Sequence, residues 1–206
     1  MKFLKLIAGI LVISAVLVSC SGSLVNLKYD DGQLINRRLG LTYTPAPTTF
    51  QPVSVGDAYG FYGELEMTLY EIKGLDPKEW LTQEYLGSAT TVFYSDSVSL
   101  PSLSDFGATK AIICSNEEIT YALVTIDDQD VVDSLVDAFE NGTPCEWPLI
   151  NAVCTYDLKF CSEELYPHLY YNLIYGEFPE GRFLYDRNTK HCVNIGTILD
   201  GYLGEE

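Results

Sequence analysis

The sequence predicts an α+β fold built mainly from antiparallel sheet, with two or three short helices. Hydrophobic residues make up 47% of the 206 residues, which is enough to form a buried core. The chain contains 15 tyrosines, and tyrosine and β-branched residues favour pleated, half-buried surfaces. Strand-like and helix-like segments do not alternate strictly, so the pattern is not that of a parallel α/β sheet.

The first half of the chain begins with a predicted hairpin turn at residues 30–32, because Asp-Gly tolerates positive φ. Apolar alternation predicts one strand around residues 39–43 and a longer, half-buried strand at residues 61–69. Three prolines interrupt the pattern between them, so residues 44–56 are expected to form a loop or an edge segment.

A short helix is predicted from Leu75 to Gly87. Asp76 is suited to the N-cap, Pro77 to the first helical position, and Glu79 completes a variant of the capping box. Gly87 is a plausible residue to end the helix.

The middle of the chain predicts a strand at residues 90–94 and a long loop over residues 95–109. A hairpin follows, with strands at residues 110–115 and 119–126. The strongest helical pattern comes next, because the apolar residues from Val131 to Phe139 form a single stripe. Asp127 or Asp128 is expected to cap this helix, and Asn141-Gly142 to end it.

The last third predicts a four-strand antiparallel meander capped by a short helix. Its strands are expected at residues 154–160, 169–175, 182–186 and 191–195. The closing helix would pack Ile198, Leu199, Tyr202 and Leu203 on the sheet. We expect a single globular domain over residues 39–206, with any sub-boundary near residues 144–148.

The protein is strongly acidic, with a formal net charge of −17. Such a surface repels nucleic acid and anionic lipid headgroups, so neither is an expected partner. Acidity of this kind commonly keeps an exported domain soluble, and a basic partner or cations are the alternative explanation.

The first twenty residues have the pattern of an export signal. Lys2 and Lys5 form a positive start, residues 6–18 carry no charge, and Leu17-Val18-Ser19-Cys20 follows. The apolar run is shorter than the roughly 20 residues that span a bilayer. The ending resembles the lipobox of bacterial lipoproteins, in which a small residue precedes the lipidated cysteine.

This resemblance implies removal of residues 1–19 as a signal peptide, cleavage between Ser19 and Cys20, and lipid attachment at the Cys20 thiol. Two or three acyl chains would anchor the protein stably. Residues 20–38 would form the lipidated tether. The expected location is the extracytoplasmic face of the cell membrane, or the outer membrane in a Gram-negative host. An uncleaved signal anchor and plain secretion are the alternatives.

Five cysteines remain after Cys20, and an odd number cannot all pair. They are Cys114, Cys145, Cys154, Cys161 and Cys192. Unbonded core thiols are the favoured interpretation, with at least one disulfide as the alternative, since an extracytoplasmic location permits disulfides. The sequence does not select one pairing.

The sequence predicts no metal site and no cofactor. Cys154, Cys161 and His168 are seven residues apart, unlike the closely spaced cysteine pairs of zinc sites, although convergence with His191 in the folded sheet is an alternative. The acidic run at residues 127–130 lacks the glycine of a calcium loop and fits a helix N-terminus.

No catalytic residue can be nominated from motifs. The sequence contains no serine-nucleophile elbow, phosphate-binding loop or dinucleotide fingerprint. His168 and His191 are each expected to be ordinary surface or packing residues. Paired carboxylates for glycan hydrolysis depend on the fold, and the 29 acidic residues do not single out a pair.

Tyrosines on polar strand faces are the best candidates for ligand contact. Alternation places Tyr62 and Tyr170 on such faces and assigns Tyr171 and Tyr175 to the core. We therefore predict a non-enzymatic, lipid-anchored module that binds an envelope protein, peptide or glycan. An envelope hydrolase acting through paired carboxylates is the alternative, and a purely structural envelope protein is a third.

Overall fold

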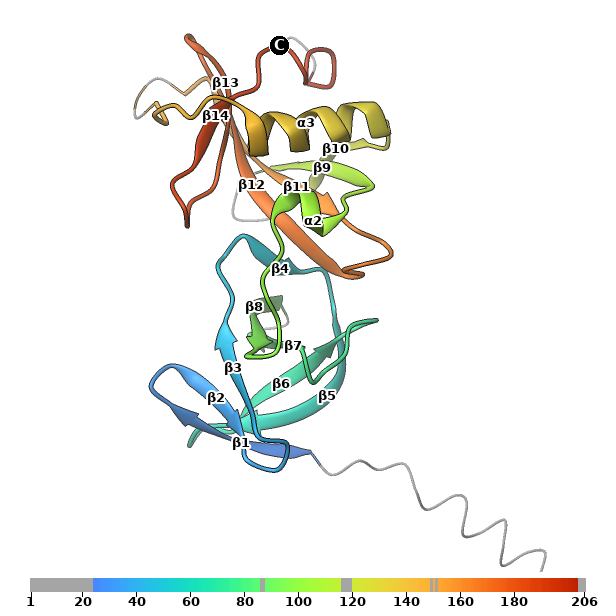
Figure 1. The fold of residues 1–206 in the computed structure, drawn as a ribbon, viewed down its shortest axis with the longest axis vertical. Coiled ribbons are helices and arrows are strands. Elements are labelled where there is room, and N and C mark those ends of the chain that lie inside the picture. Colours follow the sequence, from blue (N-terminus) through green and yellow to red (C-terminus); the bar gives the residue numbers. More distant parts are fainter. Residues whose placement is uncertain (1–23, 86–87, 116–119, 149, 151, 204–206) are drawn as a thin grey trace, which may run out of the picture.

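The structure is a computed structural model that describes residues 24–85, 88–115, 120–148, 150 and 152–203. It corrects the predicted α+β class, because the protein is mostly β. Within the described residues, fourteen strands but only two helices form, α2 (Leu103–Phe106) and α3 (Gln129–Asn141). The strands build a closed barrel and a second, separate sheet (Figure 1).

The barrel has seven strands in the order β1-β2-β3-β8-β7-β6-β5. Their bounds are β1 Val25–Asp30, β2 Gln33–Asn36, β3 Leu41–Pro45, β5 Val55–Tyr62, β6 Met67–Ile72, β7 Trp80–Tyr85 and β8 Ser88–Ser95. Neighbouring strands are antiparallel except at the closure, where β1 and β5 pair in parallel. Closure leaves the barrel without exposed strand edges.

The barrel interior is filled by side chains. Each barrel strand contributes to this core, and its fully or nearly fully buried members are Leu27, Leu34, Tyr43, Leu69, Leu81 and Phe93. Gly60 lies at the closure, and a Cβ atom there would be 2.1 Å from the carbonyl oxygen of Val25. The parallel pairing of β1 with β5 therefore requires a glycine at this position.

The second sheet has the order β10-β9-β11-β12-β13-β14, and β4 also pairs with β12. Its strands are β4 Phe50–Pro52, β9 Lys110–Ser115, β10 Ala122–Ile126, β11 Cys154–Cys161, β12 Leu169–Phe178, β13 Gly181–Tyr185 and β14 Cys192–Asn194. Helix α3 runs across one face of this sheet (Figure 1).

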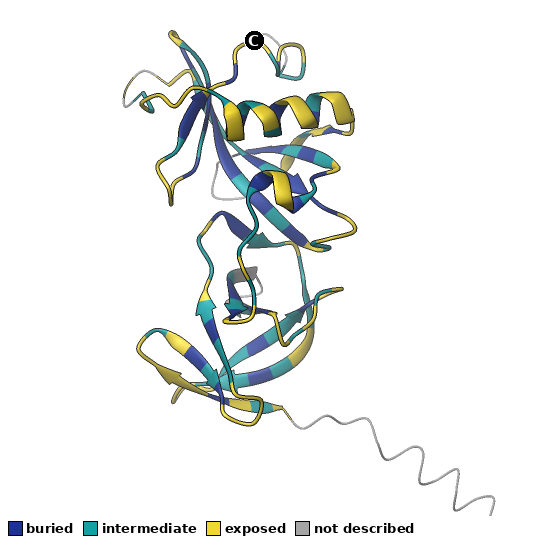
Figure 2. Cartoon of the chain, in the orientation of Figure 1, coloured by how far each residue is buried: buried dark blue, intermediate teal, exposed yellow. Residues whose placement is uncertain are grey.

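One large hydrophobic cluster joins the two parts of the molecule. The buried face of α3, with Val132, Leu135 and Phe139, packs on the inner residues of β9, β11 and β12. The same cluster includes Trp80 and Val92 from the outer surface of the barrel. In Figure 2, α3 shows mostly exposed positions, while the sheet strands beneath it are mostly buried or intermediate.

The helix predicted over residues 75–87 is wrong, because β7 occupies most of that range. The N-terminal signals are nevertheless used: Asp76 accepts hydrogen bonds from the backbone N–H of Lys78, Glu79 and Trp80. This forms a single turn. The chain then extends because pairing with β6 and β8 supplies backbone partners and buries both Trp80 and Leu81.

Three other expectations need correction. The single strand predicted at residues 61–69 is a hairpin, in which β5 ends at Tyr62 and β6 begins at Met67. Residues 25–36, expected to lie in the tether, form β1 and β2 of the barrel. The C-terminal segment forms turns rather than a helix, although Leu199 is buried and Ile198, Tyr202 and Leu203 pack on the main core.

Several predicted elements are confirmed. Asp31 and Gly32 have positive φ in the β1–β2 turn, and the strands β9 and β10 form the expected antiparallel pair. Asp128 caps α3, which ends at Asn141 as predicted. The strands β11 to β14 pair in succession as the predicted meander. The predicted loop at residues 95–109 also contains the short helix α2.

Candidate binding site

The side of the second sheet that faces away from α3 carries a mixed set of polar and apolar side chains. We call it the outer face. The strand register places Lys110 opposite Cys161, and Cys161 opposite Tyr170. Ile112 and Lys159 form the next cross-strand pair. Three strands thus bring together residues that are up to 60 positions apart in the sequence.

A hollow of about 360 Å³ lies at the end of this outer face. This volume falls at the lower end of the range for small-molecule sites. We call it the Tyr170 hollow, and its lining comprises Val53, Lys110, Ile112, Cys161, Ser162, Glu163, Pro167, His168, Leu169 and Tyr170. The predicted contact residue Tyr170 is therefore part of a concave surface, with both apolar and hydrogen-bonding neighbours.

Tyr170 is held by its position in the middle of the sheet. Its backbone pairs with Cys161 of β11 on one side and with Gln51 of β4 on the other. The Lys159 ammonium lies 5.3 Å from the centre of its ring, within the range of a cation–π contact. Burial, together with the nearby Cys161 and Cys114 thiols, raises the Tyr170 pKa. The shift favours the protonated phenol, which can donate a hydrogen bond.

The charges around the hollow are balanced. Lys110 Nζ lies 2.5 Å from Glu163 Oε1, and this partner raises the pKa of Lys110 while Lys110 lowers the pKa of Glu163. Lys159, beside Tyr170, has Asp157 two residues away on the same strand face. The chain as a whole has a net charge of −17, whereas the basic and acidic side chains around the hollow are paired. The hollow therefore does not favour a ligand of either charge.

His168 forms part of the exposed rim of the hollow. Its φ is 60°, an uncommon value for a residue other than glycine, and its carbonyl accepts a hydrogen bond from the Val53 N–H at 2.9 Å. This contact fixes the start of β12 against the end of β4. The side chain is exposed, as expected for a surface residue.

Tyr62 lies in a different part of the molecule from Tyr170. It ends β5 in the barrel, where its ring packs near Tyr29 and Phe93. Its hydroxyl donates a hydrogen bond to Gln83 Oε1 at 2.9 Å. These contacts give Tyr62 a packing role, and the structure does not bring the two predicted contact residues together. Ser19 and Cys20, the predicted processing site, lie outside the described residues.

The sequence interpretation missed Lys110, Ile112 and Lys159 as neighbours of Tyr170. Strand alternation predicts which face each of these residues occupies. Lys110 and Ile112 share one face of β9. Lys159 lies on the face of β11 opposite to the core residues Leu158 and Phe160. The pairing of β11 with both β9 and β12 could not be predicted from periodicity, and this pairing determines which residues meet.

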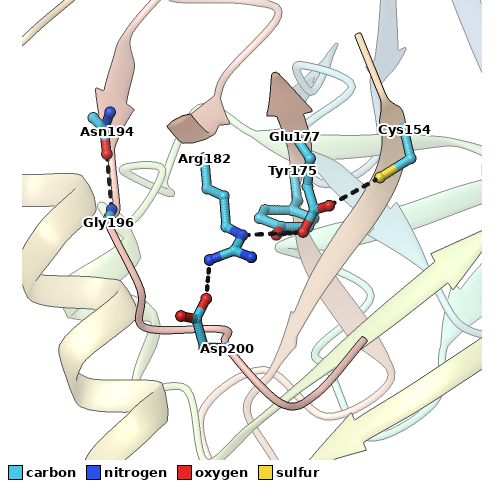
Figure 3. Close-up of polar contacts among 7 residues, drawn as sticks. All are labelled: Cys154, Tyr175, Glu177, Arg182, Asn194, Gly196 and Asp200. Atoms are coloured by element: carbon cyan, nitrogen blue, oxygen red, sulfur yellow. Dashed lines mark hydrogen bonds and ion pairs between the residues drawn. The ribbon is translucent and has the colours of Figure 1, made fainter. Parts of the chain in front are cut away.

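A cluster around Glu177 brings two carboxylates, Glu177 and Asp200, to one guanidinium group (Figure 3), and it can be compared with the paired carboxylates that glycan hydrolysis requires. Glu177 Oε1 accepts hydrogen bonds from Tyr175 Oη at 2.6 Å and from Arg182 Nε at 3.1 Å. Cys154 Sγ lies 3.6 Å from the other carboxylate oxygen. Arg182 also forms an ion pair with Asp200, so one guanidinium group bridges the two acids.

Glu177 does not have the raised pKa of a glycosidase's general acid. Burial raises the pKa of Glu177, but the hydrogen bonds from Tyr175, Arg182 and Cys154 outweigh that cost, and the net pKa is lowered. A general acid needs the opposite shift. Glu177 therefore acts as an ionised partner that ties β12, β13 and the C-terminal turns together.

The described ranges contain no group of three or more His, Cys, Asp or Glu side chains placed to hold a metal ion. In particular, His191 contacts α3 instead of a cysteine cluster: its Nε2 lies 2.8 Å from the Phe139 carbonyl oxygen. Neither helix of the described part is long and apolar enough to cross a membrane.

Comparison with known proteins adds no relative. No protein-family model, curated protein or solved structure matches the chain.

Proposed function

We propose that this protein is a lipid-anchored envelope lipoprotein whose folded part binds a glycan in the Tyr170 hollow. The observation that carries the binding proposal is the hollow itself, where a central tyrosine lies beside hydrogen-bonding side chains on a sheet face away from the cores. The anchor rests on the lipobox resemblance of residues 17–20.

The chemistry of the lining favours a neutral, polar ligand with flat apolar faces. A tyrosine ring has an apolar body and a polar tip, so it can pack on a sugar ring while its hydroxyl forms a hydrogen bond. Lys110 and His168 can donate to sugar hydroxyls. Because Lys110 is already paired with Glu163, the hollow has no excess positive charge to attract a polyanion.

The binding test uses the lipid-free protein, residues 21–206, with isolated peptidoglycan and with neutral oligomers of N-acetylglucosamine and of glucose. Binding is measured by co-sedimentation and by calorimetry. Tyr170→Ala should weaken the binding of the retained glycan by at least about tenfold, the effect of losing roughly 1.4 kcal/mol at a central contact. Tyr62→Ala serves as the matched control, because its ring belongs to the barrel.

Equal binding by wild type and Tyr170→Ala would contradict the location of the site. Failure of every glycan to bind the wild type would contradict the ligand class. Thermal unfolding of both variants separates a lost contact from a lost fold.

The anchor is tested separately in cells. Cys20→Ala should prevent lipid attachment, so the protein should leave the membrane fraction or accumulate with its leader uncleaved. Ser21→Ala is the control, since it leaves the thiol intact. A processed Cys20→Ala protein that still sediments with membranes would show that the anchor lies elsewhere.

A further inference from the structure

Cys145 and Cys192 lie directly opposite one another on neighbouring segments. Pro144 forms an isolated antiparallel bridge with Val193, and the Cys145 N–H donates to the Cys192 carbonyl at 2.9 Å. Residues paired in this way have Cα atoms about 5.5 Å apart, which is the separation most common in disulfides. The two sulfur atoms are 3.5 Å apart, and both thiols are unbonded in the structure.

The segment that carries Cys145 is held in place independently of its sulfur. Trp147, two residues later, stacks on Tyr185 at 4.9 Å and contacts Phe178 edge-on at 5.1 Å. The ring covers Gly176, where a Cβ atom would be 2.5 Å from the indole. The approach of the two thiols is therefore a consequence of packing, and no large movement is needed to join them.

The other described cysteines have different surroundings. Cys154 Sγ donates to Glu177, and Cys161 Sγ points to the Lys159 carbonyl oxygen at 4.0 Å. Cys114 is buried opposite Asp157 in the neighbouring strand. The structure thus selects one pairing among those that the sequence leaves open.

We propose that Cys145 and Cys192 form a disulfide bond in the exported protein. The inference rests on the proposed function in one respect, since an extracytoplasmic location provides oxidising conditions. The bond would fasten residues 144–145 to β14, the last strand of the second sheet, and so cover that sheet edge covalently.

The exposed Cys145 and the buried Cys192 define an order for the reaction. The Cys145 thiolate attacks a disulfide of an oxidant, such as oxidised glutathione, and releases one thiolate of it. The Cys192 thiol then loses its proton, attacks the Cys145 sulfur and releases the second thiolate. Two electrons and two protons pass to the oxidant. Burial, reinforced by the Cys145 contact, raises the pKa of Cys192 to about 12, so little of its thiolate is present at neutral pH and the first attack is left to the exposed Cys145.

Digestion after glutamate provides a direct test. It isolates Cys145 in the peptide 141–146 and Cys192 in the peptide 181–205, and neither peptide contains another cysteine. The protein is alkylated without reductant, both in its native cells before any fractionation and as the purified folded chain treated with oxidised glutathione. A cross-linked pair of these two peptides, lost after reduction, is the expected result in both samples.

Thermal unfolding gives a second readout. The cysteines are 47 positions apart, so the bond should raise the unfolding midpoint by about 5–10 °C over the reduced protein. Cys145→Ser should abolish this dependence on reductant, because it removes the exposed partner and leaves the core residue in place. Cys154→Ser, at a thiol outside the pair, should retain the dependence.

The two samples distinguish a failure of the disulfide proposal from a failure of the proposed extracytoplasmic location. A cross-link in the purified chain but free thiols in the native sample would uphold the pairing and contradict export. Alkylation of both cysteines in both samples would overturn the disulfide.

Discussion

At Glu177, three donors outweigh the cost of partly burying a carboxylate. Tyr175 comes from the same strand, Arg182 from β13 and Cys154 from β11, so the side chain gathers contacts from three neighbouring strands. Each hydrogen bond favours the ionised form, and together they lower the pKa of Glu177 despite desolvation. A single side chain thereby makes the stability of this sheet corner dependent on pH.

The sign of that dependence is fixed by the direction of the shift. The folded pKa of Glu177 lies below its ordinary value of 4.5, so the contribution to stability is complete above pH 4.5 and is lost as the pH falls through the folded pKa. Glu177→Gln should therefore lose less stability than wild type between pH 6 and pH 3.5, as measured by urea unfolding. Glu180→Gln, at an exposed neighbouring position, should retain the wild-type pH dependence. Parallel pH profiles for wild type and Glu177→Gln would contradict this assignment.

Strand β7 is an element that local sequence patterns predict wrongly, because they favour a helix over this range. The residues before it carry the N-terminal capping signals of a helix. These residues form the expected hydrogen bonds to Asp76, but the helical conformation ends after one turn. The strand has buried residues on both sides, since Leu81 points into the barrel core and Trp80 into the main core. Its first two residues are apolar and buried, but Thr82, Gln83 and Glu84 follow them, so the apolar alternation that identifies a half-buried strand is absent. The pairing partners, which are distant in the sequence, decide the conformation.

Closure of the barrel is a property of the β1–β5 pair, and Gly60 permits it. Gly60→Ala would place a Cβ atom 2.1 Å from the Val25 carbonyl oxygen, so the two strands would have to separate. We expect a loss of about 1–3 kcal/mol in the free energy of unfolding, measured with urea. Ala58→Ser, at an exposed position of the same strand, should change it by less than about 0.5 kcal/mol. Equal stability of Gly60→Ala and wild type would show that the strands are not closely paired at this point.

The whole molecule consists of two β units that share a hydrophobic core. The barrel has its own small interior cluster, while the main cluster spans the second sheet, α3 and the outer surface of β7 and β8. Trp80 is central to the junction: it is 2% exposed, and its ring lies about 6 Å from the rings of Phe50, Tyr94 and Tyr166. The barrel and the second sheet are therefore expected to unfold together.

Trp80→Ala should break this coupling. Removing a buried tryptophan costs about 3–5 kcal/mol, and the cavity would lie between the two units. Circular dichroism in urea should show a lower midpoint and a broader transition than wild type, because the units would begin to unfold separately. Leu123→Ala, at an exposed position of β10, is the control and should leave the transition unchanged. A loss below about 1 kcal/mol with a sharp transition would contradict a shared core.

Local patterns in the sequence were sufficient where short-range physics decides the structure. The capped stripe of α3, the Asp-Gly turn and the alternation of Tyr170 with Tyr171 each depend on residues that are close in the chain, and the structure confirms all three. The lipobox resemblance at Cys20 likewise depends on twenty consecutive residues and remains a prediction. Only the tertiary structure decided the barrel, the neighbours of Tyr170 and the approach of Cys145 to Cys192. Each of these arises from pairing between distant strands, and strand pairing depends on which hydrogen-bonding partners and apolar faces meet in space.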